Sequence, residues 1–181
     1  MSRRRFLALA GGLAVPPAIA TAGTVATPQA VVSGPPPPRV EWRDVTLLDG
    51  SHVRADWLRN APVVVEFWAS WCPFCARQNP QLQALWDAQR ANGLRVLTFS
   101  IDRDPGAARR YVADHRYTFP AALQSAQSAR SFGPRRGLPM LYVVDPAGRI
   151  VVEEAGEMFA EDVAALARYA PAPAARDTSR S

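Results

Sequence analysis

Cys72 and Cys75 are the residues of this 181-residue chain whose types and spacing point most directly to chemistry, and they are its only cysteines. Two thiols at this spacing can cycle between a dithiol and a disulfide. Such a pair can also be half of a structural zinc site, which needs four ligands. The chain has no second cysteine pair, and its two histidines, His52 and His115, do not make up the shortfall. We therefore expect a redox pair and no metal site.

The elements that must position this pair are a strand before it and a helix after it. An apolar run covers residues 63–68, and a helix-compatible stretch begins at Pro73. Pro73 suits the first position of a helix, where its missing N–H costs no hydrogen bond. Unpaired backbone N–H groups and the helix dipole favour a thiolate at that end of a helix. We therefore expect Cys72 to be the nucleophile and Cys75 to join it in the disulfide from within the first turn.

The segment Phe-Trp-Ala-Ser-Trp-Cys-Pro-Phe-Cys at residues 67–75 resembles the thioredoxin superfamily, and more closely the exported TlpA/ResA-like thiol-disulfide oxidoreductases. Pro80 falls where that family has a proline that bends the helix. Leu138 and Pro139 precede an apolar run, as the family's cis-proline loop does. The resemblance covers about residues 40–170. It implies a thioredoxin-like α/β fold with a central mixed sheet flanked by helices.

Glu66 interrupts an apolar run that is expected to form a strand buried on both faces, where a carboxylate is costly. It matches the position of the buried acid of thioredoxin. A carboxyl group whose pKa is raised by desolvation could relay the proton of Cys75 through a water, so we expect Glu66 to be catalytic. The alternatives are a solvent-exposed side chain or an ion pair with an arginine at the sheet margin. Thr98 stands where thioredoxin has a lysine near this acid, which is a departure from the pattern.

Substrate contacts are expected from two segments. Trp71, Pro73 and Phe74 adjoin the cysteines, and the two aromatic side chains can form an apolar surface around the sulfurs. The resemblance implies that Leu138 and Pro139 also bind substrate, because a cis bond exposes the preceding backbone to pairing with an extended chain. Trans is the general expectation for a proline in a turn, so only the resemblance favours the cis isomer.

The start of the chain is typical of an export signal. Within residues 1–20, Ser-Arg-Arg-Arg-Phe-Leu at positions 2–7 leads into an apolar stretch of about half the roughly 20 residues that a membrane-spanning helix needs, and small residues close the segment. The arginine pair resembles the twin-arginine motif, and a general basic leader is the alternative. We expect a cleaved signal rather than a permanent anchor.

Three further segments follow the signal. Residues 21–38 end in four consecutive prolines and form a spacer, residues 39–170 form the thioredoxin-like domain, and residues 171–181 form a disordered tail.

The formal net charge of +5 falls to +2 when the three arginines at positions 3–5 are removed, since 18 basic and 16 acidic residues remain. This balance gives no reason to expect a nucleic-acid partner.

Between its ends the chain alternates between strand and helix patterns, which predicts an α/β fold. Asp49-Gly50 predicts a hairpin turn between strands at 45–48 and 51–54. The other expected strands cover residues 63–69, 94–101, 119–123, 140–145 and 149–154, and the expected helices cover residues 73–91, 105–116 and 161–169. The helix at 105–116, with Asp104 as its N-cap, and the short strand after it resemble the family's insertion after the second core strand.

The sequence thus predicts a thiol-disulfide oxidoreductase without a cofactor. The resemblance implies a periplasmic reductase of protein cysteines, of the kind that serves cytochrome c maturation or metal-centre assembly, and a membrane or periplasmic redox partner. Two alternatives stay open. One is a DsbA-like dithiol oxidase, because potentials in such proteins span about −270 to −120 mV. The other is a copper-binding assembly protein on the same fold, although such proteins have a wider cysteine spacing and a late histidine.

Overall fold

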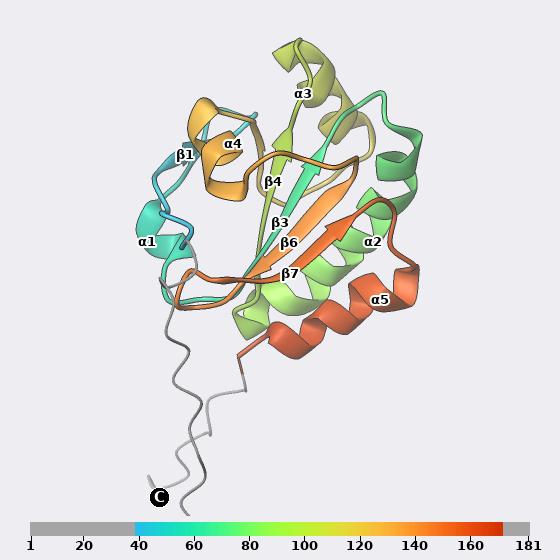
Figure 1. Ribbon diagram of the computed structural model, residues 1–181. Coiled ribbons are helices and arrows are strands. Elements are labelled where there is room, and N and C mark those ends of the chain that lie inside the picture. Colours follow the sequence, from blue (N-terminus) through green and yellow to red (C-terminus); the bar gives the residue numbers. More distant parts are fainter. Residues whose placement is uncertain (1–38, 172–181) are drawn as a thin grey trace, which may run out of the picture. The chain divides into compact units, whose positions relative to one another are not determined.

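The described part of the protein, residues 39–171 of a computed structural model, contains a five-stranded mixed sheet and a separate two-stranded hairpin (Figure 1). The predicted signal, the spacer and all of the predicted tail except Pro171 lie outside the described residues. The strand order in the sheet is β5-β4-β3-β6-β7. These strands are β3 (Val63–Trp68), β4 (Arg95–Ser100), β5 (Ala121–Leu123), β6 (Met140–Val144) and β7 (Ile150–Ala155). The predicted fold class is confirmed.

Strand β3 lies at the centre of the sheet and carries the chain toward the cysteines. It pairs in parallel with β4 and antiparallel with β6, and all six of its residues are buried. Helix α2 (Pro73–Gln89) makes the crossover from β3 to β4. It continues as a short 3₁₀ turn and ends at Gly93, whose φ of 88° is left-handed. The cysteines therefore lie where the central strand passes into this helix, as predicted.

The two faces of the sheet have separate hydrophobic cores. Val64 and Trp68 of β3 belong to the core formed with α2 and α5 (Ala160–Ala165), whereas Val63, Val65 and Phe67 belong to the core on the other face. Figure 1 shows α2 and α5 on one side of the sheet and α1 (Ala55–Leu58) and α4 (Ala126–Phe132) on the other. Because side chains alternate along a strand, Glu66 faces the same side as Val64 and Trp68. That side is covered by the helix that carries both cysteines.

Most predicted elements are present with shifted ends. The hairpin consists of β1 (Val45–Thr46) and β2 (His52–Val53), so its strands are shorter than expected. Helix α3 (Pro105–Asp114) begins after Asp104, which caps it through hydrogen bonds from two backbone N–H groups, as predicted. The predicted last helix is α5 followed by a 3₁₀ turn, Leu166–Tyr169. The sequence did not predict α1 and α4. Within residues 39–171, every helix is too short or too polar to cross a membrane.

Candidate active site

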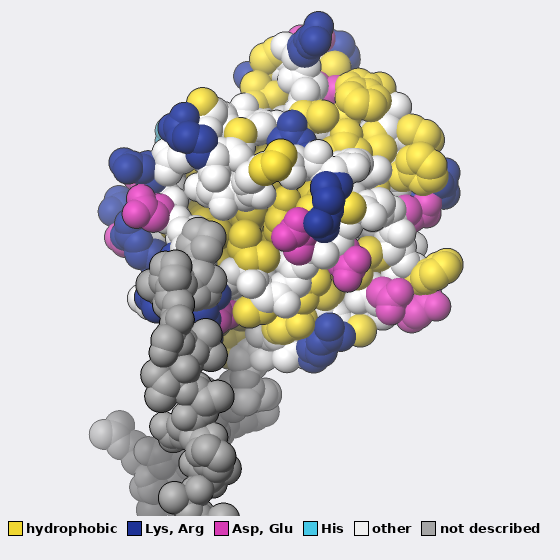
Figure 2. Space-filling view, in the orientation of Figure 1, with side chains coloured by type: hydrophobic (Ala, Val, Ile, Leu, Met, Phe, Trp, Pro, Cys, Tyr) yellow, Lys and Arg dark blue, Asp and Glu magenta, His cyan; other side chains and the backbone are white. Residues whose placement is uncertain are grey.

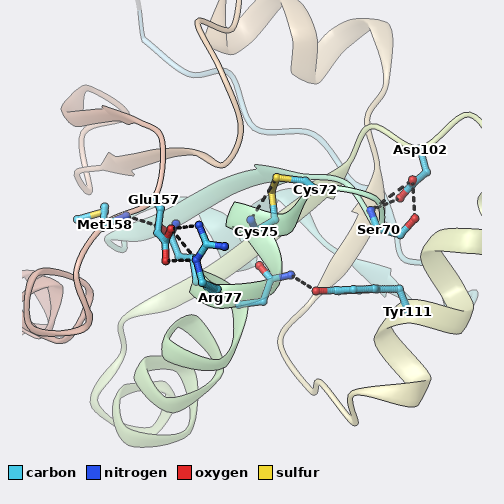
Figure 3. The surroundings of a disulfide bond; sticks show 10 residues. Ser70, Cys72, Cys75, Arg77, Asp102, Tyr111, Glu157 and Met158 are labelled. Atoms are coloured by element: carbon cyan, nitrogen blue, oxygen red, sulfur yellow. Dashed lines mark hydrogen bonds and ion pairs between the residues drawn. A yellow bond between two sulfur atoms is a disulfide. The ribbon is translucent and has the colours of Figure 1, made fainter.

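Cys72 and Cys75 form a disulfide at the N-terminus of α2, with their Cα atoms 5.3 Å apart (Figure 3). Cys72 is the N-cap residue, and its sulfur accepts a hydrogen bond from the backbone N–H of Cys75 at 3.1 Å. Pro73 occupies the first helical position. Cys75 is fully buried, whereas Cys72 keeps 4 % of its surface exposed. Of the two cysteines, Cys72 is therefore the one that is closer to solvent, and a helix N-terminus favours its thiolate form.

Aromatic side chains lie on either side of Cys72 in the sequence. Trp71 is 67 % exposed and Phe74 is 50 % exposed, whereas Trp68 is fully buried. Trp68 packs against Tyr111 of α3, with ring centroids 5.1 Å apart. In Figure 2 apolar side chains gather over the end of the sheet where β3 passes into α2. The residues next to the cysteines thus present an apolar surface to solvent.

The Leu138–Pro139 bond is cis, as the resemblance implied. Pro139 is buried directly before β6, and its carbonyl oxygen accepts a hydrogen bond from the Gly156 N–H at 2.8 Å. Leu138 is half-buried and lines the same groove as Phe74. Phe74, which lies between the two cysteines in the sequence, and Leu138 therefore meet at one groove, whereas Trp71, Pro73 and Pro139 do not line it.

This groove, of about 570 Å³, is completed by residues that the sequence did not predict. Arg77 of α2 and Glu157 of the β7–α5 loop form a bidentate ion pair, with nitrogen–oxygen distances of 2.6–2.9 Å (Figure 3). Phe159, in the same loop, is 74 % exposed. The remaining lining residues are Gln81, Gly156, Met158 and Ala160. In the sequence this loop carries no motif, so only its folding against α2 identifies it.

Glu66 is fully buried in β3, which excludes the solvent-exposed alternative. Its neighbour in β4 is Thr98, whose hydroxyl accepts a hydrogen bond from the Trp68 indole N–H at 3.1 Å. None of the ion pairs within residues 39–171 includes Glu66. Burial raises the pKa of the Glu66 carboxyl to about 8, and the nearby Gln78 amide opposes this rise. A carboxyl group with this pKa can both accept and return a proton near neutral pH.

Asp102 is a further residue near the site that the sequence did not single out. It follows β4, and its carboxylate accepts hydrogen bonds from the Ser70 backbone N–H at 3.0 Å and from the Ser70 hydroxyl at 2.8 Å (Figure 3). The Ser100 hydroxyl donates to the same carboxylate at 2.6 Å. The loop that leads into Cys72 is therefore tied to the end of the neighbouring strand.

Among the described residues, no group of three or more His, Cys, Asp or Glu side chains could hold a metal ion. His52 contacts Thr46 in the hairpin, and His115 packs against Tyr111 and Tyr117. Neither histidine comes together with the cysteines.

Residues 38–153 match the AhpC/TSA family. The chain belongs to this family. Among curated proteins it is similar to the thiol-disulfide oxidoreductase ResA of Bacillus thuringiensis, with 25 % identity over 122 residues that cover 66 % of this chain and 69 % of that protein. It is also similar to the sporulation thiol-disulfide oxidoreductase A of Bacillus subtilis, with 24 % identity over 58 % of this chain and 66 % of that protein.

A solved structure with the same fold is a thiol:disulfide interchange protein of Chlorobium tepidum, with a TM-score of 0.69 and 18 % identity over 76 % of this chain and 99 % of that one. The enzyme class predicted from the sequence is confirmed: this AhpC/TSA family member is a thiol-disulfide oxidoreductase with a Cys-X-X-Cys pair. The predicted resemblance to ResA-like proteins is confirmed as well.

Proposed function

We propose that this chain is an exported oxidoreductase that reduces disulfides in protein substrates, with Cys72 as nucleophile and Cys75 as the resolving cysteine. The placement of the two sulfurs carries the proposal: Cys72 reaches solvent at the N-terminus of α2, and Cys75 is buried behind it. This arrangement supports attack by one sulfur on a substrate and attack by the other on the resulting mixed disulfide.

The reaction begins with the reduced enzyme. The Cys72 thiolate attacks one sulfur of the substrate disulfide, forms a mixed disulfide and releases the other substrate sulfur as a thiolate, which takes a proton from water. Cys75 then gives its thiol proton through a water to the Glu66 carboxylate and attacks the Cys72 sulfur. The enzyme disulfide forms, and the second substrate sulfur leaves and is protonated. Two electrons pass to the substrate, and a dithiol partner protein restores the enzyme by the reverse exchange.

The direction of electron flow is decided by the reduction potential of the Cys72–Cys75 pair. We expect a midpoint near that of thioredoxin, about −270 mV, in a series of thiol–disulfide redox buffers that covers both values. The measurement is the fraction of alkylated Cys72 in each buffer, determined by mass spectrometry. A midpoint near that of DsbA, about −120 mV, would instead establish the dithiol oxidase alternative.

The groove beside the disulfide supports a polypeptide substrate with an apolar side chain near its cysteine. Phe74 and Leu138 line the groove, and Phe159 extends the apolar surface at its end. Apolar area that a bound chain covers contributes about 25 cal/mol per Å². A small polar disulfide cannot cover this surface, so the groove favours protein cysteines over small thiols.

We expect Phe159→Ala to lower kcat/KM about tenfold for a peptide disulfide with leucine beside its cysteine, because truncation of an exposed aromatic contact removes part of the binding energy. The rate with a small disulfide such as oxidised 2-mercaptoethanol should not change. Val151→Ala is the matched control, since Val151 is 46 % exposed on β7 and does not line the groove. Equal loss on both substrates, or loss in the control, would contradict a peptide-binding role.

We propose export from the signal in residues 1–20. We also propose that residues 21–38 are a spacer and that residues 171–181 are a tail. We expect Arg3→Lys with Arg4→Lys to leave the precursor in the cytoplasm, because twin-arginine recognition depends on the two guanidinium groups. Arg5→Lys is the control and should be exported normally. Immunoblots of cell fractions measure the outcome. Export of the double variant, with sensitivity to a block of the general secretory channel, would favour the basic leader instead.

A further inference from the structure

Helix α2 carries two amide side chains in the stripe that faces the sheet. Its buried residues are Cys75, Gln78, Asn79, Leu82, Leu85 and Trp86. Their spacing of three and four residues places them on one side of the helix, where apolar side chains are expected. Gln78 and Asn79 are both fully buried. Two amides in a core stripe directly after the redox pair require a polar partner, and Glu66 lies on the facing side of β3.

Asn79 connects this acid with the resolving cysteine. In the amide orientation that satisfies its neighbours, its nitrogen donates to Glu66 Oε1 at 3.0 Å and to the Cys75 carbonyl oxygen at 3.3 Å. The Asn79 oxygen is then the amide atom 3.4 Å from the Tyr111 hydroxyl, which can donate to it. Figure 3 shows Tyr111 extending from α3 toward the first turns of α2. One amide thus contacts the acid, the resolving cysteine and a half-buried tyrosine.

The other groups that face Glu66 come from three elements and from the segment that follows α3. Gln78 belongs to α2, Thr98 to β4, and Tyr111 and Tyr117 to α3 and the segment after it. Burial raises the pKa of both tyrosine hydroxyls, and the charge on Glu66 contributes to the rise. Both tyrosines are therefore neutral at physiological pH. The Gln78 oxygen accepts a hydrogen bond from the Met158 N–H at 2.7 Å, so its amide nitrogen is the part of the side chain that acts on Glu66.

We propose that Asn79 is a positioning residue for the proton transfer from Cys75: its amide holds the Glu66 carboxyl beside the resolving cysteine and favours the charged form that accepts the proton. The inference rests on the proposed function for the step it serves. An N–H donor stabilises the carboxylate more than the neutral acid, whereas burial acts in the opposite direction. Asn79 thereby keeps the carboxyl group ready for transfer, without itself exchanging a proton.

The test replaces Asn79 with leucine, which has nearly the same shape but no donor. A hydrogen bond to the carboxylate stabilises the charged form of Glu66. Its loss should therefore raise the pKa of Glu66 by about one pH unit. The measurement is the pH titration of the Glu66 side-chain carboxyl carbon by NMR of ¹³C-glutamate-labelled protein. In single turnover with a small disulfide, the attack of Cys75 on the mixed disulfide should be about tenfold slower at pH 7. It should regain most of the wild-type rate near pH 10.

Leu82→Ala is the matched control, because Leu82 lies one turn further along the same buried stripe and has no polar group. It should lower stability without moving the Glu66 titration. If the leucine variant does not fold, Asn79→Ala has the same expected result. An unchanged titration without the Asn79 amide, or an equal change in Leu82→Ala, would overturn the positioning role. Failure of the wild type to reduce any disulfide would instead defeat the proposed function, while the NMR titration would still decide the role of Asn79.

Discussion

A Cys75→Ser variant should retain its substrates as stable mixed disulfides, whereas a Cys72→Ser variant should retain none. Cys72 is the cysteine with exposed surface and stands at the N-terminus of α2, so it forms the first bond to the substrate. Cys75 is buried behind it and completes the exchange. Turnover should fall to the uncatalysed rate in both variants, since the two sulfurs act as a unit.

The measurement uses both variants expressed in the native host and separated on non-reducing gels. High-molecular-weight adducts that disappear on reduction should occur only with Cys75→Ser, and mass spectrometry of these adducts identifies the substrates. A variant with both cysteines replaced by serine should form no adducts, because the chain has no other cysteine. Adducts that form through Cys75 in the Cys72→Ser variant would reverse the roles assigned to the two sulfurs.

Glu66→Gln should make the enzyme slower and, at alkaline pH, more stable. Loss of a general acid–base group typically costs about 100-fold or more in rate. Because the glutamine cannot titrate, the rise of the rate with pH that Glu66 causes near pH 8 should also disappear. Glu161→Gln on α5 is the control, since Glu161 is exposed. A wild-type rate between about pH 6 and 9 in the Gln variant would end the catalytic role of Glu66.

The stability change has a defined pH window. The pKa of Glu66 is raised from 4.5 to about 8 on folding, so the folded protein retains a proton that the unfolded chain loses. The wild type should therefore lose stability as the pH rises from about 4.5 to 8, by about 5 kcal/mol in total, and the glutamine variant should not. Urea unfolding of the two oxidised proteins at several pH values measures this difference. A difference that is independent of pH would contradict the raised pKa.

The sequence predicted the parts of the site that lie close together in the chain. An apolar run, a proline at the first helical position and two cysteines three residues apart specify β3, the start of α2 and the redox pair through local rules. The burial of Glu66 followed from its place within that run. Helix α4 was missed because its short, serine-rich segment has a weak apolar pattern, although Ser125 and Ser128 form a capping box at its start.

The residues that were missed in the site depend on contacts between distant segments. Asn79 and Gln78 looked like ordinary polar residues of a helix, and only the packing of α2 on β3 makes them partners of a buried acid. Asp102 reaches Ser70 across 32 positions of the chain. Phe159 became part of the groove because the β7–α5 loop returns to α2. Such pairings follow from the tertiary fold, which a pattern in one segment does not specify.

The β7–α5 loop is held at three points, and this determines what a bound substrate must contribute. Gly156 donates to the Pro139 carbonyl, Met158 donates to the Gln78 amide, and Glu157 pairs with Arg77. A wall fixed in this way is already ordered before binding, so the entropy cost of association falls on the incoming chain. A segment that is already unfolded loses conformational entropy when the groove orders it, but it does not pay the free energy of leaving a folded structure. Under the proposed function, an unfolded segment of a substrate protein is therefore the form that this surface accepts at the lowest total cost.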